Sequence, residues 1–158
     1  KSYKKSLSSN SNPYTPAVNL VFALDESLKM MKDEGLDSIF KRHQRHKLAV
    51  SEAAKTLNLE LFADDKHLSP SVTAIQIKDL DAEQFRKTIK NKYDILLAGG
   101  QDHLKGKIFR VGHLGYINDR DIISVIAAIG NTLVENNKIS TEQVGEALAV
   151  AACNLKST

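Results

Sequence analysis

One arginine lies inside an apolar segment and is the first candidate for binding chemistry. Arg110 occurs in the run Ile108-Phe109-Arg110-Val111, whose composition is typical of a β-strand. Arginine is rarely buried without a partner, so we expect an anionic group near its guanidinium. A structural interpretation gives it an internal Asp or Glu partner, or places it on an exposed sheet face. A functional interpretation has its guanidinium fork bind a substrate carboxylate in bidentate geometry.

A threonine–proline pair near the N-terminus is the second candidate. Thr15 has the residue type of a helix N-cap, and Pro16 that of a first helical position. A hydroxyl at a helix N-terminus can also contribute to a phosphate site, because the helix dipole and the unpaired N–H groups there favour anions. The two roles of Thr15 do not exclude one another.

A glycine-containing segment, residues 99–107, has only a superficial likeness to a phosphate-binding loop. The P-loop pattern is G-x-x-x-x-G-K-S/T and is followed by a helix. Here Gly100 and Gly106 enclose five residues, Lys107 is followed by Ile108, and a strand is expected next. The segment therefore favours a flexible connection between two strands over a nucleotide site. Glycine also permits close approach of a ligand to the backbone, so a binding role stays open.

The histidines carry weaker signals. His43 and His46 are three residues apart on a predicted helix, but no third ligand accompanies them, so a metal site is not expected. His103 and His113 flank the strand that contains Arg110. We expect a surface role for each of these two, while a place in a binding site stays open.

The composition is that of a soluble globular domain. The 158 residues suffice for one domain with a sizeable core, and a formal net charge of +3 is too small to indicate nucleic acid or membrane binding. Apolar runs stay well below the ~20 residues that span a bilayer, and no signal peptide is visible. Cys153 is the only cysteine, which excludes an internal disulfide and fits a reducing, cytoplasmic setting. Its Ala-rich surroundings predict a packed side chain.

The elements that must position these residues follow from periodicity and from turn and cap signals. Residues 1–14 are polar and predict an extended arm or linker, and a start without Met favours truncation of a longer protein. Residues 15–158 are then one domain. Strands are predicted at 59–62, 72–77, 94–98 and 107–112, and helices from 15 to 35, 36 to 57, 82 onward, 119 onward and 141 to 153. This order predicts an α+β two-layer sandwich, with a small, mostly antiparallel sheet and helices on one face.

Local signals mark where the helices begin and end. Gly35 is a natural stop for the first long helix. Residues 81–84 (DAEQ) and 140–143 (STEQ) resemble capping boxes, and Asn118 is a predicted N-cap.

Two blocks of sequence together match the pattern of one protein family. The first block comprises Tyr14–Leu20, Ala23-Leu24, Glu26–Leu28, Glu34–Leu36 and Arg42-His43, and the second comprises Ala98–Gly100 and Leu104–Gly115. In order and spacing they resemble the C-terminal domain of the class V pyridoxal-phosphate (PLP) aminotransferases, nearest to the alanine–glyoxylate and serine–glyoxylate enzymes. Some cyanobacterial members carry the label of a soluble hydrogenase small subunit. A single cysteine cannot ligate an iron–sulfur or nickel–iron centre, so hydrogenase chemistry is not expected.

The resemblance implies a fold-type I PLP enzyme with a large cofactor domain, a small C-terminal domain and a homodimer with sites at the subunit interface. It implies transfer of an amino group from an amino acid to glyoxylate or another 2-oxo acid. Arg110 matches the arginine that binds the α-carboxylate of the amino acid. Thr15 matches a threonine that reaches the PLP phosphate of the neighbouring subunit. A family tyrosine that also touches this phosphate has no secure match, because Asn12 aligns better than Tyr14.

The resemblance also implies that the cofactor lysine, the aspartate beside the pyridinium nitrogen and the stacking aromatic lie upstream of Lys1. Since those groups support the electron-sink chemistry, we predict that this chain alone neither binds PLP nor transaminates. One alternative is a stand-alone binding or dimerisation module with an anion site at Arg110. Another is cysteine desulfuration, for which Cys153 in a terminal helix is badly placed.

Overall fold

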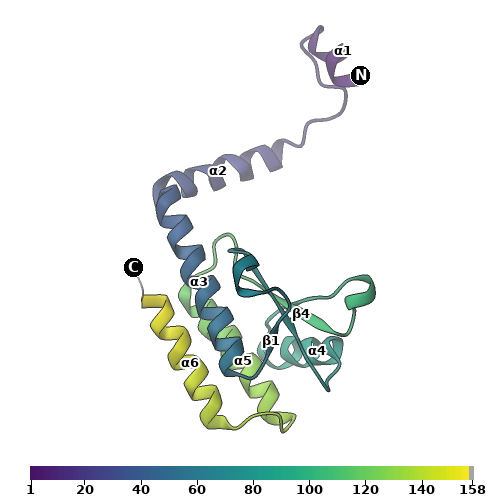
Figure 1. Cartoon of the computed structure of the whole chain (residues 1–158). Helices are drawn as coiled ribbons and strands as arrows, with labels where there is room; N and C mark the ends of the chain where they lie inside the picture. The colour runs from purple at the N-terminus through teal and green to yellow at the C-terminus, as the bar shows by residue number, and fades with distance from the viewer. Residues whose placement is uncertain (157–158) are drawn as a thin grey trace. The chain divides into compact units, whose positions relative to one another are not determined.

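The computed structural model describes residues 1–156, which form two compact units, residues 1–39 and residues 40 onward (Figure 1). The helices of this part of the chain are α1 (Ser2–Leu7), α2 (Val18–Glu34), α3 (Leu36–Thr56), α4 (Ala82–Tyr93), α5 (Asp119–Glu135) and α6 (Thr141–Lys156). The strands are β1 (Glu60–Leu61), β2 (Val72–Gln76), β3 (Ala98–Gly99) and β4 (Ile108–Gly112). Helix α3 begins in the first unit and continues into the second.

The second unit contains a four-stranded sheet with the order β1-β2-β4-β3, in which each neighbouring pair is antiparallel. Strand β4 pairs along its length with β2, with Phe109 opposite Ile75 and Val111 opposite Thr73. These four side chains are buried, and alternation along the strands directs them to one face. The predicted α+β architecture with a small antiparallel sheet is confirmed.

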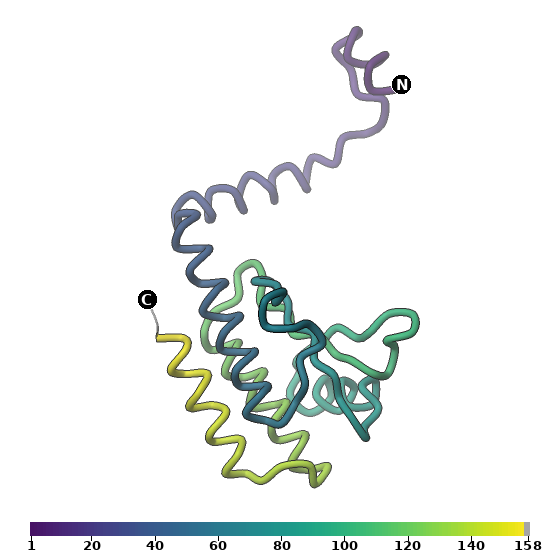
Figure 2. Tube along the Cα trace, viewed as in Figure 1, coloured from purple at the N-terminus to yellow at the C-terminus, as the bar shows by residue number. Residues whose placement is uncertain are grey.

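The hydrophobic core of the second unit lies between this sheet face and the helices. Helices α3, α5 and α6 run alongside one another beside the sheet, as the chain trace in Figure 2 also shows. Helix α4 adds Phe85 and Ile89, and the Phe85 ring packs against Phe109 with ring centroids 5.3 Å apart. Burial of such side chains contributes about 2 kcal/mol each, so this layer carries much of the stability.

The predicted starts of the last three helices are confirmed. The carboxylate of Asp81 accepts a hydrogen bond from the backbone N–H of Gln84 at 2.8 Å. Asn118 forms a complete capping box with Asp121, since each side chain accepts from the other's backbone N–H. The hydroxyl of Ser140 accepts more weakly, at 3.4 Å from the Gln143 nitrogen.

The first unit differs from the sequence prediction at two points. Residues 2–7 form a short helix, although an extended arm was expected there. The prediction of Thr15 as an N-cap is wrong, because α2 begins at Val18 and its N-cap is Ala17. Ala17 has φ −78° and ψ 67°, and the Val18 N–H donates to Pro16 O at 2.9 Å. This inverse γ-turn delays the helix start. The division into an arm of residues 1–14 and a domain of 15–158 stays a prediction.

The predicted buried strand at residues 94–98 is correct only at its end. Helix α4 ends with Asp94 as its C-cap, and the backbone of Asp94 is in the left-handed conformation, with φ 54° and ψ 30°. Residues 95–97 lead from this cap toward the sheet, where Ala98 and Gly99 pair with β4 and the Gly100 N–H donates to Ile108 O at 3.2 Å. Strand β3 is therefore a two-residue edge strand.

Candidate functional site

Arg110 is the central residue of β4 and lies on the sheet face opposite the core. Its cross-strand partners are Ala74 in β2 and Ala98 in β3. The neighbouring residues Phe109 and Val111 face the core, so alternation directs Arg110 outward. Its side chain is half-buried, and its Nε donates a hydrogen bond to the carbonyl oxygen of Gly99 at 3.1 Å.

The guanidinium of Arg110 has no acidic partner within the chain that the structure describes. Between residues 1 and 156, no Asp or Glu oxygen lies within 4.0 Å of it. Of the two structural interpretations, the internal ion pair is therefore wrong for these residues, whereas the position on an outward sheet face stays open. Both cross-strand partners are alanines, so neither places a long side chain beside the guanidinium. With Nε held by a backbone carbonyl, the two Nη groups keep the donor geometry that suits a carboxylate.

The glycine segment beside this strand is a tight turn packed against α4. A methyl group on Gly100 would lie 2.1 Å from the backbone oxygen of Leu104. Gly106 has φ +76°, and its carbonyl accepts from the Ala82 N–H at 2.9 Å. Strand β4 follows the turn, so the geometry is not that of a P-loop. The glycines are thus required by the turn itself.

Thr15 belongs to the first unit and Arg110 to the second, so each is considered by itself. Thr15 is exposed, and its hydroxyl has no hydrogen-bond partner in residues 1–156. Tyr14 is 69% exposed, and its ring packs edge-on against Tyr3. An exposed hydroxyl suits a single contact with a phosphate oxygen, so Thr15 fits the contact that the resemblance implies.

The expected surface role of His113 is wrong, because its side chain is completely buried. Its Nδ1 lies 3.1 Å from Pro70 O and its Nε2 lies 2.9 Å from the hydroxyl oxygen of Thr73. A carbonyl only accepts, so Nδ1 carries the proton and Nε2 accepts from Thr73. Burial lowers the pKa of His113 to about 4. The alternation of Phe109 and Val111 extends to residue 113, and this signal indicates the buried side.

A second histidine, His46, is also buried, although the sequence prediction considered it only as a metal ligand. His46 on α3 is fully buried, and its Nε2 lies 2.8 Å from Asp119 Oδ1. Its Nδ1 has no hydrogen-bond partner among residues 1–156, and burial lowers the pKa of the imidazole. The spacing of His46 from Ala49, Val50 and Ala53 places it on the buried stripe of α3. This histidine joins the start of α5 to α3.

Two further residues considered from the sequence, His103 and Cys153, are exposed. His103 is exposed in the 3-10 turn of residues 102–104. Cys153 is exposed, so the prediction of a packed side chain is wrong. It points away from the buried stripe of α6, which includes Ala147, Ala151 and Leu155.

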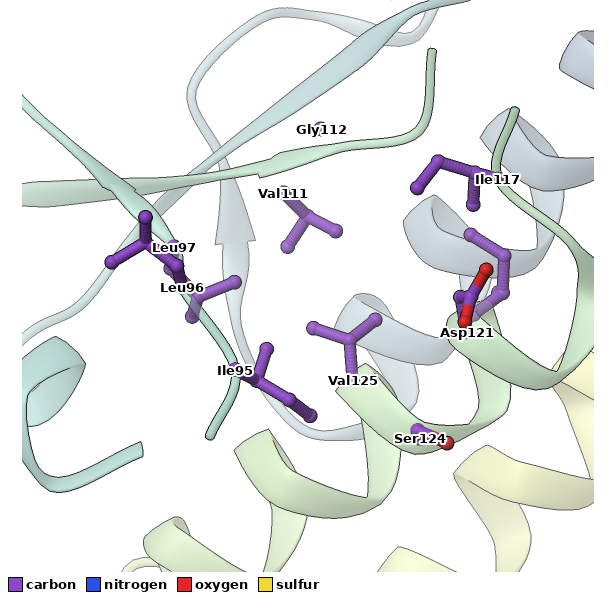
Figure 3. Close-up of a pocket in the computed structure, with 10 residues that line it drawn as sticks. Ile95, Leu96, Leu97, Val111, Gly112, Ile117, Asp121, Ser124 and Val125 are labelled. Atoms are coloured by element: carbon purple, nitrogen blue, oxygen red, sulfur yellow. The ribbon is translucent and has the colours of Figure 1, made fainter. Parts of the chain in front are cut away.

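A hollow of about 260 Å³ lies between the sheet and α5 (Figure 3). Ile95, Val111 and Val125 point toward one another across it. The carboxylate of Asp121, which also lines it, is engaged by the backbone N–H of Asn118. Arg110 does not line this hollow. Its walls suit apolar atoms and offer little for polar chemistry.

No group of three or more His, Cys, Asp or Glu side chains in residues 1–156 is arranged to hold a metal ion. No helix in the same range combines the length and the apolar character needed to cross a membrane.

Comparison with protein-family models finds no match. Among curated proteins, the chain is 53% identical over 133 residues to the "soluble hydrogenase 42 kDa subunit" of Anabaena cylindrica, covering 84% of this chain and 35% of that protein. It is 32% identical over 139 residues to the serine–glyoxylate aminotransferase of Methylorubrum extorquens, covering 87% and 35%. Among solved structures, the ureidoglycine–glyoxylate aminotransferase of Bacillus subtilis matches with a TM-score of 0.85 and 30% identity, covering 94% of this chain and 38% of that one.

The fold is that of the C-terminal domain of PLP aminotransferases. The homologues of this chain are class V aminotransferases, and the chain corresponds to their C-terminal part. It spans about a third of the length of the curated relatives that it matches.

Proposed function

We propose that this chain provides the carboxylate-binding part of a PLP-dependent aminotransferase, which transfers an amino group from an amino acid to glyoxylate or another 2-oxo acid. The observation that carries the proposal is the state of Arg110. Its Nε is held by Gly99 O, while its guanidinium has no acidic partner in residues 1–156. The relatives named serine–glyoxylate and ureidoglycine–glyoxylate aminotransferase support this class of substrate.

In this proposal Arg110 binds and orients the substrate. Its two Nη groups donate parallel hydrogen bonds to the α-carboxylate of the amino acid. A fixed carboxylate restricts rotation of the rest of the molecule, so the bond to be broken at Cα keeps one orientation. Binding of a 2-oxo acid uses the same contact, since both substrates carry a carboxylate.

Thr15 is the residue of this chain that we assign to PLP. With PLP bound in the neighbouring subunit of a homodimer, the exposed Thr15 hydroxyl would donate a hydrogen bond to the cofactor phosphate. When bound, PLP supplies the electron sink for the reaction at Cα. The resemblance assigns no residue of this chain to the cofactor ring, so the chain alone is proposed to be inactive.

The test uses a chimeric enzyme, called the joined enzyme below, in which this chain is fused to the residues that precede the matched region in the Methylorubrum extorquens protein. We expect Arg110→Ala to raise the KM for the amino acid and to lower kcat/KM roughly 100-fold, about 3 kcal/mol, because two charged hydrogen bonds are lost. Arg110→Lys keeps the charge without the fork and should be intermediate. The control is Lys92→Ala, which removes an exposed ion pair with Glu135 on another face. Kinetics of Arg110→Ala equal to those of the control would refute the role.

A second candidate is a dimerisation module without catalysis, and the surface of α2 favours it. This helix has no buried residue, and Leu20, Val21 and Phe22 are 62–70% exposed. Apolar helix surfaces of this extent usually pack against another chain or domain. Sedimentation of the 158-residue chain tests this second candidate. A stable dimer that dissociates in Phe22→Glu supports the module, and a monomer at every concentration argues against it.

A further inference from the structure

The edge strand β3 connects Arg110 to helix α4. Strand β3 consists of Ala98 and Gly99 and pairs only with β4. This short ladder, even with the adjoining bond from the Gly100 N–H to Ile108 O, is a weak constraint on an edge strand, because each backbone hydrogen bond contributes only about 1 kcal/mol. The carbonyl of Gly99 nevertheless has to stay in place, since it accepts the hydrogen bond from Arg110 Nε.

Arg86 on α4 provides the additional constraint. Its Nε donates to the carbonyl oxygen of Leu97 at 2.7 Å, immediately before β3. Its Nη1 lies 2.9 Å from each carboxylate oxygen of Glu83, one turn earlier on the same helix. The Arg86 side chain is only 21% exposed, so this ion pair is partly shielded from solvent. One planar guanidinium therefore joins the helix to the backbone of the edge strand.

Gly99 is in direct contact with this pair. A methyl group on Gly99 would lie 2.5 Å from Arg86 Nη1 and 2.5 Å from Glu83 Oε1. Only glycine allows the guanidinium to pack this closely against the strand. The same residue thus has the Glu83–Arg86 pair against its α-carbon and Arg110 Nε on its carbonyl oxygen.

We propose that Arg86 is a positioning residue, which fixes the orientation of the Arg110 guanidinium by holding the Leu97–Gly99 backbone. The inference rests on the proposed function in one respect: the oriented guanidinium matters for carboxylate binding only if Arg110 is the carboxylate ligand. Lysine at position 86 cannot replace the contact, because one ammonium group lacks the planar fork that reaches both Leu97 O and Glu83.

The first experiment observes Arg110 directly in the 158-residue chain. Arginine Nε–H groups give separate ¹⁵N–¹H signals, and the Arg110 signal is assigned by its loss in Arg110→Lys. We expect hydrogen exchange at Arg110 Nε–H to accelerate about fivefold or more in Arg86→Ala and in Arg86→Lys, which corresponds to one lost hydrogen bond. An exchange rate unchanged in both variants overturns the proposal, because Arg110 would then be held independently of Arg86.

A matched control separates positioning from general loosening of α4. Lys92→Ala breaks the exposed pair of α4 with Glu135, at 2.5 Å, and leaves β3 untouched. We expect no change in Arg110 exchange in this variant. Equal acceleration in Lys92→Ala and Arg86→Ala would show that any perturbation of α4 is sufficient, and this result also overturns the specific role.

The second experiment measures kinetics in the joined enzyme. Arg86→Ala should raise the KM for the amino acid severalfold, less than Arg110→Ala does, and leave kcat at saturation within about twofold. A lower kcat with unchanged KM contradicts the positioning role. If Arg110→Ala itself leaves KM unchanged, the proposed function fails, whereas the exchange measurement still decides whether Arg86 orients Arg110.

Discussion

Lowering the pH from 7 to 5 is expected to destabilise the second unit through His113. This imidazole is completely buried, with Nδ1–H directed at Pro70 O and Nε2 accepting from Thr73. A second proton on Nε2 would face the Thr73 hydroxyl in a site that contains no carboxylate partner for His113. Burial therefore lowers the pKa of His113 from 6.5 to about 4.

The sign and size of the effect follow from proton linkage. Between pH 6.5 and pH 4 the unfolded chain binds a proton at His113 and the folded chain does not, so stability falls as the pH falls. At about 1.4 kcal/mol per pH unit, the loss is about 2 kcal/mol by pH 5 and reaches about 3 kcal/mol near pH 4. The pKa of His46 is also lowered by burial and contributes with the same sign.

Urea unfolding followed by circular dichroism at pH 7 and pH 5 measures the loss. In His113→Gln no proton is bound at this position, so we expect the free energy of unfolding to lose about 2 kcal/mol less over the same interval. His103→Gln, the same substitution at an exposed histidine, is the matched control for the substitution itself. The reasoning is refuted if His113→Gln and the wild type lose the same free energy, or if NMR titration gives His113 a pKa near 6.5.

Three further predictions concern a helix cap, a turn and the cofactor. Asn118→Ala removes the capping box of α5 and should lower the free energy of unfolding by about 1 kcal/mol in urea titrations, with no change in m-value. Gly100→Ala places a methyl against Leu104 O and should cost about 2 kcal/mol or more, because the obstacle is backbone; wild-type stability would contradict the tight turn. When PLP is added to the 158-residue chain and the unbound cofactor is removed by gel filtration, we expect no PLP absorbance in the protein fraction. A retained, shifted band would contradict the proposed inactivity of the chain alone.

The architecture could be predicted because its signals are local. Alternation along residues 72–76 and 108–112 identifies the two long strands, and residues such as Asp81 and Asn118 mark helix starts by satisfying N–H groups three residues away. The core follows from these elements, since each has one apolar face. Arg110 was singled out for the same reason, as a charged residue within an apolar strand.

Other features depend on local turn geometry that residue types do not reveal, or on partners that are distant in sequence. The inverse γ-turn at Ala17 cancels the cap signal of Thr15. The extent of β3 is set by its pairing with β4, which composition does not encode. The contact of Arg86 with Leu97 O joins residues 11 apart across a helix end, and no periodicity indicates it. The orientation of the Arg110 side chain could therefore be described only from the structure, whereas Arg110 itself could be identified from the sequence.

The most direct test of the account is a crystal structure of the joined enzyme with a bound amino-acid substrate analogue. The account predicts that both oxygens of the α-carboxylate lie within hydrogen-bond distance of the two Nη atoms of Arg110, while Nε keeps its contact with Gly99 O. A carboxylate bound by other residues, with Arg110 turned to solvent, would contradict the central claim.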